Sequence, residues 1–187
     1  MTLGLVIFLV VVGLGLVFAI AGYNRLVGLT QRSAEAWSDM DVQLKRRTDL
    51  VPNLVETVKG YAAHERGTFE TVVRARGAAV TAATPDARAR AEGQLSDALR
   101  QLFALAEAYP DLKASENFQS LQKSLGEIED SIQNSRRYYN AVVRDLNTAV
   151  DTFPSNFIAS SFRFEKRGYF ELDRPEDRQA PRVSFGS

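Results

Sequence analysis

The first part of the chain is almost uniformly apolar, and the rest alternates apolar and polar positions at helical spacing. The run from Leu3 to Ala21 reads LGLVIFLVVVGLGLVFAIA, 19 residues without a charge. A helix of this length is about 28 Å long, which nearly matches the roughly 30 Å hydrocarbon core of a bilayer. Backbone groups in lipid must hydrogen-bond within the protein, and a single helix meets this requirement. The pattern predicts a transmembrane helix over residues 1–22.

A cleaved signal peptide is the alternative interpretation of the same run. Ala19 and Ala21 form an A-x-A-like pair, as cleavage sites do. However, a signal peptide begins with positive charges and has a shorter apolar stretch, whereas only the N-terminal amine precedes this run. The pattern therefore favours a retained, single-pass anchor.

The cations nearest to the apolar run all follow it. Arg25 and Arg32 come first, and Lys45, Arg46 and Arg47 follow as a compact group. Positive residues flanking a membrane helix favour the cytoplasmic side. This bias predicts an N-terminus outside and a cytoplasmic C-terminal part.

The most regular pattern lies between Ser115 and Pro154, a plausible N-cap and a helix stop. Two series of mostly apolar residues recur there every seven positions, and together they form one continuous stripe of a helix of about 39 residues, about 58 Å long. A seven-residue repeat is typical of bundle or coiled-coil packing. The first series is Phe118, Leu125, Ile132, Tyr139, Leu146 and Phe153, and the second is Leu121, Ile128, Ser135, Val142 and Ala149.

Shorter helical patterns precede this one. A helix beginning near Tyr23 is interrupted by Pro52, which either kinks it or starts a new helix, and the pattern then resumes from Asn53 to Val73. The segment 81–94, TAATPDARARAEGQ, is predicted to be a turn. Another helix follows it, with Leu95, Leu99, Leu102, Ala106 and Tyr109 on one side. These segments predict an all-α fold, in which residues 23–154 form a long antiparallel, up-and-down bundle.

The C-terminal residues differ in character. Residues 155–173 are rich in aromatic side chains, which we expect either to cover one end of the bundle or to dock onto a neighbouring subunit or the membrane surface. Residues 174–187 have the composition of a disordered tail. The aromatic residues are Phe157, Phe162, Phe164, Tyr169 and Phe170.

Composition excludes several kinds of chemistry. The 23 basic and 23 acidic residues balance, which argues against a nucleic-acid partner, and the absence of Cys excludes disulfides and thiolate sites. The single histidine, His64, precedes Glu65, but Thr68 stands where the zinc motif H-E-x-x-H needs its second histidine. We therefore expect no enzyme, cofactor or metal. The Lys45–Arg47 group is either a contact for anionic lipid or an acidic partner, or simply an exposed helix face.

Short motifs are spread along the chain from the end of the apolar run to the aromatic segment. They are Tyr23–Val27, Ala36-Trp37, Asp41–Arg47, Asp49–Tyr61, His64-Glu65, Ala75-Arg76, Tyr109–Ala114, Asn117-Phe118, Leu121-Gln122, Tyr139-Asn140, Phe153-Pro154 and Tyr169-Phe170. These runs resemble the LemA family of bacterial membrane proteins. The resemblance implies an N-terminal membrane helix, a long antiparallel bundle and no catalytic residues. Relatives in this family are linked to magnetosome membranes and to envelope-stress settings with membrane proteases.

Two functions fit this picture, and an enzyme is kept as a third hypothesis. The first is a scaffold in the bacterial inner membrane, whose protomers form a homo-oligomer that organises or shapes the lipid bilayer. The second is an adaptor that presents its bundle to a membrane protease or another envelope protein. The candidate interaction residues are Tyr23, Asn24, Lys45, Arg46, Arg47, Asn53, Lys59, Phe162, Phe164, Tyr169 and Phe170.

Overall fold

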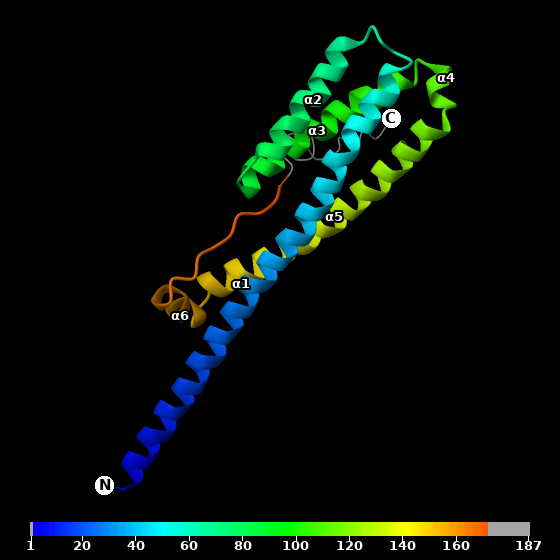
Figure 1. The fold of residues 1–187 in the computed structure, drawn as a ribbon. Coiled ribbons are helices and arrows are strands. Elements are labelled where there is room, and N and C mark those ends of the chain that lie inside the picture. Colours follow the sequence, from blue (N-terminus) through cyan, green and yellow to red (C-terminus); the bar gives the residue numbers. More distant parts are fainter. Residues whose placement is uncertain (1, 172–187) are drawn as a thin grey trace, which may run out of the picture. The chain divides into compact units, whose positions relative to one another are not determined.

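The computed structural model describes residues 2–171, and the regular secondary structure in this part of the chain is helix, with no strand. Its elements are α1 (Thr2–Lys59), α2 (Arg66–Thr81), α3 (Pro85–Ala106), α4 (Pro110–Lys113), α5 (Glu116–Asp151) and α6 (Ser155–Ser161), as Figure 1 shows. The all-α prediction is confirmed. The predicted disordered tail, 174–187, lies outside the described residues.

The chain divides into two compact units. The first holds residues 2–41 and Gln133–Tyr169, and the second holds Val42–Ile132 with Phe170. The long helices α1 and α5 each contribute to both units, so each unit is described by itself.

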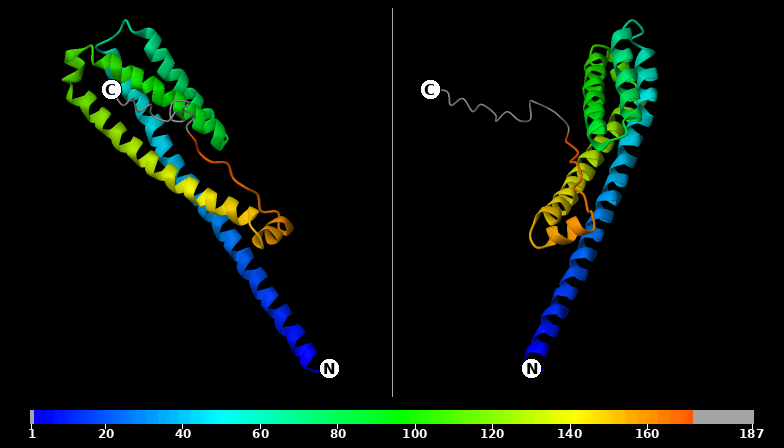
Figure 2. Two further views of the ribbon diagram at one scale, coloured as in Figure 1. Left: turned by 180° about the vertical axis from the view of Figure 1, so that it is seen from behind. Right: turned by 90° about the vertical axis from the view of Figure 1, so that its left-hand side faces the viewer.

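The second unit is an up-and-down bundle of four helices. The final part of α1, then α2, α3 and the first part of α5 run alternately in opposite directions, as the views of Figure 2 show. Their apolar faces share one core, to which the buried α4 residue Leu112 also belongs. Its members include Val51, Leu54 and Val58 of α1, Phe69 and Val72 of α2, Leu95, Leu99 and Leu102 of α3, and Phe118 and Leu125 of α5.

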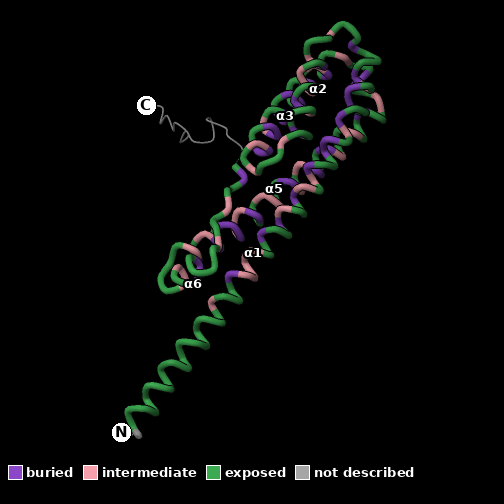
Figure 3. Tube along the Cα trace, turned by 60° about the vertical axis from the view of Figure 1, so that its left-hand side comes forward, coloured by how far each residue is buried: buried purple, intermediate pink, exposed green. Residues whose placement is uncertain are grey.

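The first unit contains the apolar start of α1. The helix is long and apolar enough to cross a membrane: its most apolar window has a mean hydropathy of 3.1, and none of that window is buried (Figure 3). Beyond it, Leu26 packs with residues of α5 and α6. That small core comprises Leu26, Leu146, Ala149, Ile158 and Ala159, with Leu29, Val150 and Phe164 against it.

The stripe predicted on the last long helix is confirmed, apart from its end. Phe118, Leu125, Ile132, Tyr139 and Leu146 are all buried, whereas Phe153 lies beyond Asp151, where α5 ends, and is exposed. Seven-residue spacing therefore marks one face along the whole of α5.

Of the two outcomes left open at Pro52, the structure shows a continuing helix, whereas the helical pattern expected from Asn53 to Val73 is interrupted. The helix α1 ends at Lys59, before Gly60, and the chain turns back over residues 60–65. Glycine is a poor helix former, and the Val58 carbonyl accepts from the amides of both Tyr61 and Ala62 as the helix closes.

The predicted turn over residues 81–94 was also too long. Only residues 82–84 connect the helices, because α3 already begins at Pro85, whose missing N–H is harmless at the first helical position. The Thr84 hydroxyl caps the helix by accepting from the Ala87 amide at 3.2 Å. Residues 86–94 are therefore helical, and some of them face the core.

Candidate functional site

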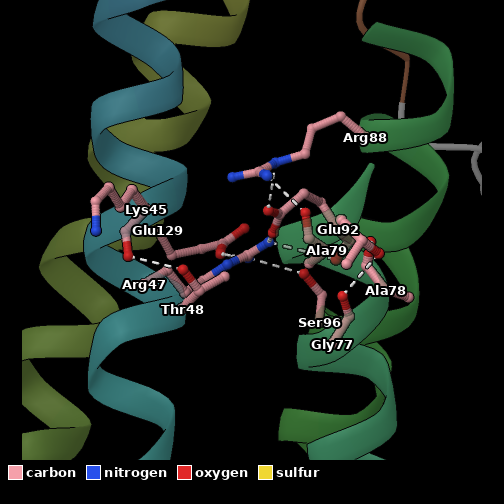
Figure 4. A network of polar contacts seen from close by, with 11 residues as sticks. Lys45, Arg47, Thr48, Gly77, Ala78, Ala79, Arg88, Glu92, Ser96 and Glu129 are labelled. Atoms are coloured by element: carbon pink, nitrogen blue, oxygen red, sulfur yellow. Dashed lines mark hydrogen bonds and ion pairs between the residues drawn. The ribbon is translucent and has the colours of Figure 1, made fainter. Parts of the chain in front are cut away.

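A buried network of charges joins the helices of the second unit (Figure 4). At its centre the Arg47 guanidinium of α1 donates to Glu92 of α3, to Glu129 of α5 at 2.6 Å and to the Ser96 hydroxyl at 3.0 Å. The Arg47 and Glu92 side chains are 3% and 0% exposed. One arginine thus links three helices.

Arg88 extends the network to the fourth helix. Its Nε lies 3.1 Å from Oε1 of Glu92, one turn away on α3, and its Nη1 donates to the carbonyl of Ala79 on α2 at 2.5 Å. Two guanidinium groups therefore meet the carboxylates of Glu92 and Glu129. Burying charges is costly unless each finds a partner with good geometry, and in this network the opposite charges balance.

These residues occupy positions where apolar side chains would be expected. On α1, Arg47 lies between Leu44 and Val51 in the 3-4 spacing of the core face. On α3, Arg88 and Glu92 continue backwards the spacing that Leu95 and Leu99 begin. Buried polar groups at core positions penalise any helix register that leaves them unpaired, so the network favours one alignment of the four helices.

A second polar contact explains why α1 tolerates Pro52. Proline has no N–H, so the carbonyl of Thr48, four residues earlier, loses its usual helical donor. Nε of Arg76 on α2 donates to this carbonyl at 2.7 Å. The bond lost within α1 is thus replaced by a bond between two helices.

A half-open pocket of about 330 Å³ lies beside the charge network. Leu99, Phe103 and Leu125 supply apolar walls, and Arg47 and Glu129 are polar groups at its edge. Because Arg47 already forms ion pairs with Glu92 and Glu129, its charge is neutralised within the protein. The pocket therefore offers mainly apolar contact.

In the first unit, aromatic side chains gather where α1 leaves its apolar segment. The Tyr23 ring lies 4.8 Å from that of Phe162 and 5.7 Å from that of Phe164. Further along α1, the Trp37 ring lies 5.5 Å from the ring of Tyr139 on α5. The residues after α6 thus run back beside α1 and α5.

Two residues of α5 hold this returning segment. The Asn147 amide donates to the Arg167 carbonyl and accepts from the Arg167 amide, both at 2.9 Å. The buried Tyr139 donates its hydroxyl proton to the Gly168 carbonyl, also at 2.9 Å. Asn147 therefore pairs with the backbone as a neighbouring strand would, and fixes the path of the extension.

Two predicted interaction residues are buried. Arg47 lies in the charge network, because two positions along a helix turn a side chain about 200° away from Lys45. Phe170 is fully buried as well. Neither of them offers a free surface, so the expected continuous basic face does not include Arg47.

The other predicted residues lie at or near the surface. Asn24 and Asn53 are exposed, Lys45 pairs with Asp49 at 3.0 Å, and Arg46 donates to Gln43 at 3.1 Å. Lys59 pairs with Glu56 and lies 5.9 Å from the centre of the Phe69 ring. Tyr23, Phe162 and Tyr169 are exposed and Phe164 is half-buried. The structure brings Tyr23, Phe162 and Phe164 together, and their role in binding stays a prediction.

The sequence that forms this architecture of one apolar helix and a helical bundle is similar to those of known proteins. The sequence pattern of the LemA family matches residues 36–185, most of the chain. The chain belongs to the LemA family. Its relatives include magnetosome proteins MamQ 1 and MamQ 2 of Paramagnetospirillum magneticum, each 26% identical over 175 residues, and magnetosome protein MamQ of Magnetospirillum gryphiswaldense, 25% identical over 174 residues.

These alignments cover 79–80% of this LemA-family chain and 64% of each relative. The chain therefore spans slightly less than two thirds of the length of the curated relatives that it matches. Together with the single apolar helix, membership of the LemA family indicates a membrane-associated protein.

Proposed function

We propose that this LemA-family protein is a non-enzymatic, membrane-anchored bundle, whose protomers assemble to organise or shape the bacterial inner membrane. The observation that carries the proposal is α1. Its apolar segment continues, without a break in the helix, into residues that pack against α5 and α6. Phe18 and Ala21 of this segment line the same pocket as Phe153 and Pro154, which supports a segment that is retained in the protein.

The outer face of α2 supports assembly. Val73 and Val80, seven residues apart, are both more than half exposed, and the exposed Gly77 lies between them. The buried face of the same helix carries Phe69 and Val72. Because the core covers only one apolar stripe of α2, the other is available to a partner. Anchoring in a membrane raises the local concentration of the protein, so the same faces of two copies meet often.

The adaptor function rests on the pocket beside the charge network. Its apolar walls, Leu99, Phe103 and Leu125, suit an apolar side chain from another protein. In this role the protomer would remain alone and bind a membrane protease or another envelope protein.

The mass of the full-length protein in mild detergent distinguishes these two functions, measured beside a chain that begins at Tyr23. The scaffold requires a large, defined assembly that depends on the membrane helix. A monomer in both preparations would contradict the scaffold and support the adaptor, whose partner would then be sought by crosslinking in native membranes. The flanking arginines support a cytoplasmic bundle, and labelling of single introduced cysteines by a membrane-impermeant reagent tests this placement.

A further inference from the structure

We propose that α6, the turn before it and its C-cap residue form a foot that inserts aromatic side chains into the interfacial zone of the membrane. The foot comprises Phe153, Phe157 and Phe162. The proposal rests on the proposed anchoring of residues 3–21, and it adds a second contact with lipid beside the spanning helix.

The foot touches α1 at the residue that follows the apolar run. A Cβ atom built on Gly22 would lie only 2.4 Å from Cδ1 of Ile158 in α6, so glycine allows the close approach. One residue further, the rings of Tyr23 and Phe162 are 4.8 Å apart. Figures 1 and 2 accordingly show α6 beside α1 just beyond its free apolar segment.

The depth of the foot follows from the pocket next to it. This pocket, of about 340 Å³, is lined by Phe18 and Ala21 of the apolar segment and by Phe153 and Pro154 of the turn. The turn thus reaches the last helical turn of the span. Because the span is about as long as the hydrocarbon core is thick, its last turn lies at the boundary with the headgroups.

The exposed side chains suit this boundary. Phe153, Phe157 and Phe162 are 73%, 64% and 62% exposed, and the rings of Phe153 and Phe157 lie 5.9 Å apart. Aromatic rings are enriched where hydrocarbon meets headgroups. The exposed cations Arg25, which also lines the pocket, and Arg163 are placed to reach lipid phosphates.

The backbone holds the foot in place. Arg163 has a φ of 57°, and the amides of Phe164 and Arg163 donate to the carbonyls of Ala159 at 2.9 Å and Ser160 at 3.4 Å, as in a Schellman helix end. Ile158 and Ala159 face the small core of this unit, which leaves Phe157 outside it. The rings are therefore presented by a packed element.

Single spin labels test the foot in the full-length protein, because the sequence contains no cysteine. Three variants, Phe157→Cys, Tyr138→Cys and Leu9→Cys, are labelled with a nitroxide and reconstituted in bilayers containing anionic phospholipid. All three positions are more than half exposed, so the label disturbs little packing. Collision with oxygen, which enters lipid, is compared with collision with a water-soluble nickel complex.

We expect the oxygen-to-nickel ratio to be severalfold higher at residue 157 than at residue 138, and highest at residue 9. A ratio at 157 equal to that at 138, with a high ratio at 9, would overturn the foot and leave the anchor intact. A low ratio at 9 would overturn both. Low collision with both reagents at residue 157 would show that protein covers the foot. A high ratio at residue 138 would show that this side of α5 also lies on lipid. Either result overturns the proposal.

Discussion

At the scale of single residues, Glu92 is the buried carboxylate that pairs with two arginines. It is fully buried and faces both Arg47 and Arg88. Removing one partner of a buried ion pair leaves an uncompensated charge, which typically costs about 3–5 kcal/mol. We therefore expect Glu92→Gln to lower the free energy of unfolding by about this amount, measured by circular dichroism in urea.

Asp97 provides the matched control, on the same helix. It pairs with Arg100 at the surface, where both side chains are about 60% exposed. Exposed pairs contribute about 0–1 kcal/mol, so Asp97→Asn should have a small effect. Equal losses in the two variants would show that the network does not stabilise the bundle.

Pro52 and Arg76 should be coupled energetically. Arg76 supplies the donor that Pro52 cannot, at the Thr48 carbonyl. Arg76→Met leaves this carbonyl without that donor, and we expect a loss of about 1–2 kcal/mol. In a Pro52→Ala background the alanine amide replaces the donor, so the same change should cost less. A double-mutant cycle of unfolding free energies measures the coupling between residues 52 and 76. Additive effects would show that the Arg76 side chain does not replace the hydrogen bond that Pro52 lacks.

At the scale of elements, the stripe of α5 predicts where truncation is costly. Leu125 and Ile132 are 5% and 2% exposed. Each change to alanine removes buried methyl groups and leaves a cavity, so we expect a loss of about 2–5 kcal/mol. Tyr138→Ala, on the exposed side of the same helix, is the control. Thermal unfolding checks the prediction. Unchanged unfolding midpoints for both core variants would show that Leu125 and Ile132 do not face the core.

Apolar spacing predicted the elements of this fold better than it predicted their ends. The stripe of α5 was visible because nearly every core position carries an apolar residue. The start of α3 was missed because its core positions carry Arg88 and Glu92, and a polar segment with proline resembles a loop. Continuing the 4-3 spacing backwards from Leu95 would have placed both residues on the core face.

Other features depend on contacts between distant segments, and no local pattern contains them. The helix α1 is supported at Pro52 by Arg76, which lies 24 positions further along the chain. The pairing of Asn147 with the Arg167 backbone, and the partnership of Arg47 with Glu129, are similarly remote in sequence. Charged residues are expected at the surface, so a lone sequence gives little reason to bury Arg47.

At the scale of the whole molecule, the proposed assembly requires a surface through which copies meet. The outer stripe of α2, defined by Val73, Gly77 and Val80, repeats the 4-3 spacing of the internal seams. At a contact between like faces, a charge at Val80 would be desolvated and would approach its own copy. We therefore expect Val80→Glu to convert the large assembly of full-length protein in mild detergent to small species.

Val42→Glu is the control that separates the effect of an added charge from the effect of its position on α2. Val42 is 52% exposed and Val80 is 53% exposed, and both lie on helices of the same unit, but Val42 lacks an apolar neighbour seven residues away on an outer face. A new charge there should leave the mass unchanged. Disassembly by both variants would mean that added charge alone opposes association, and an intact assembly of the Val80→Glu protein would exclude the α2 stripe as the contact. Selective loss with Val80→Glu would instead tie assembly to one helix face, since the bundle core and the membrane span are the same in both variants.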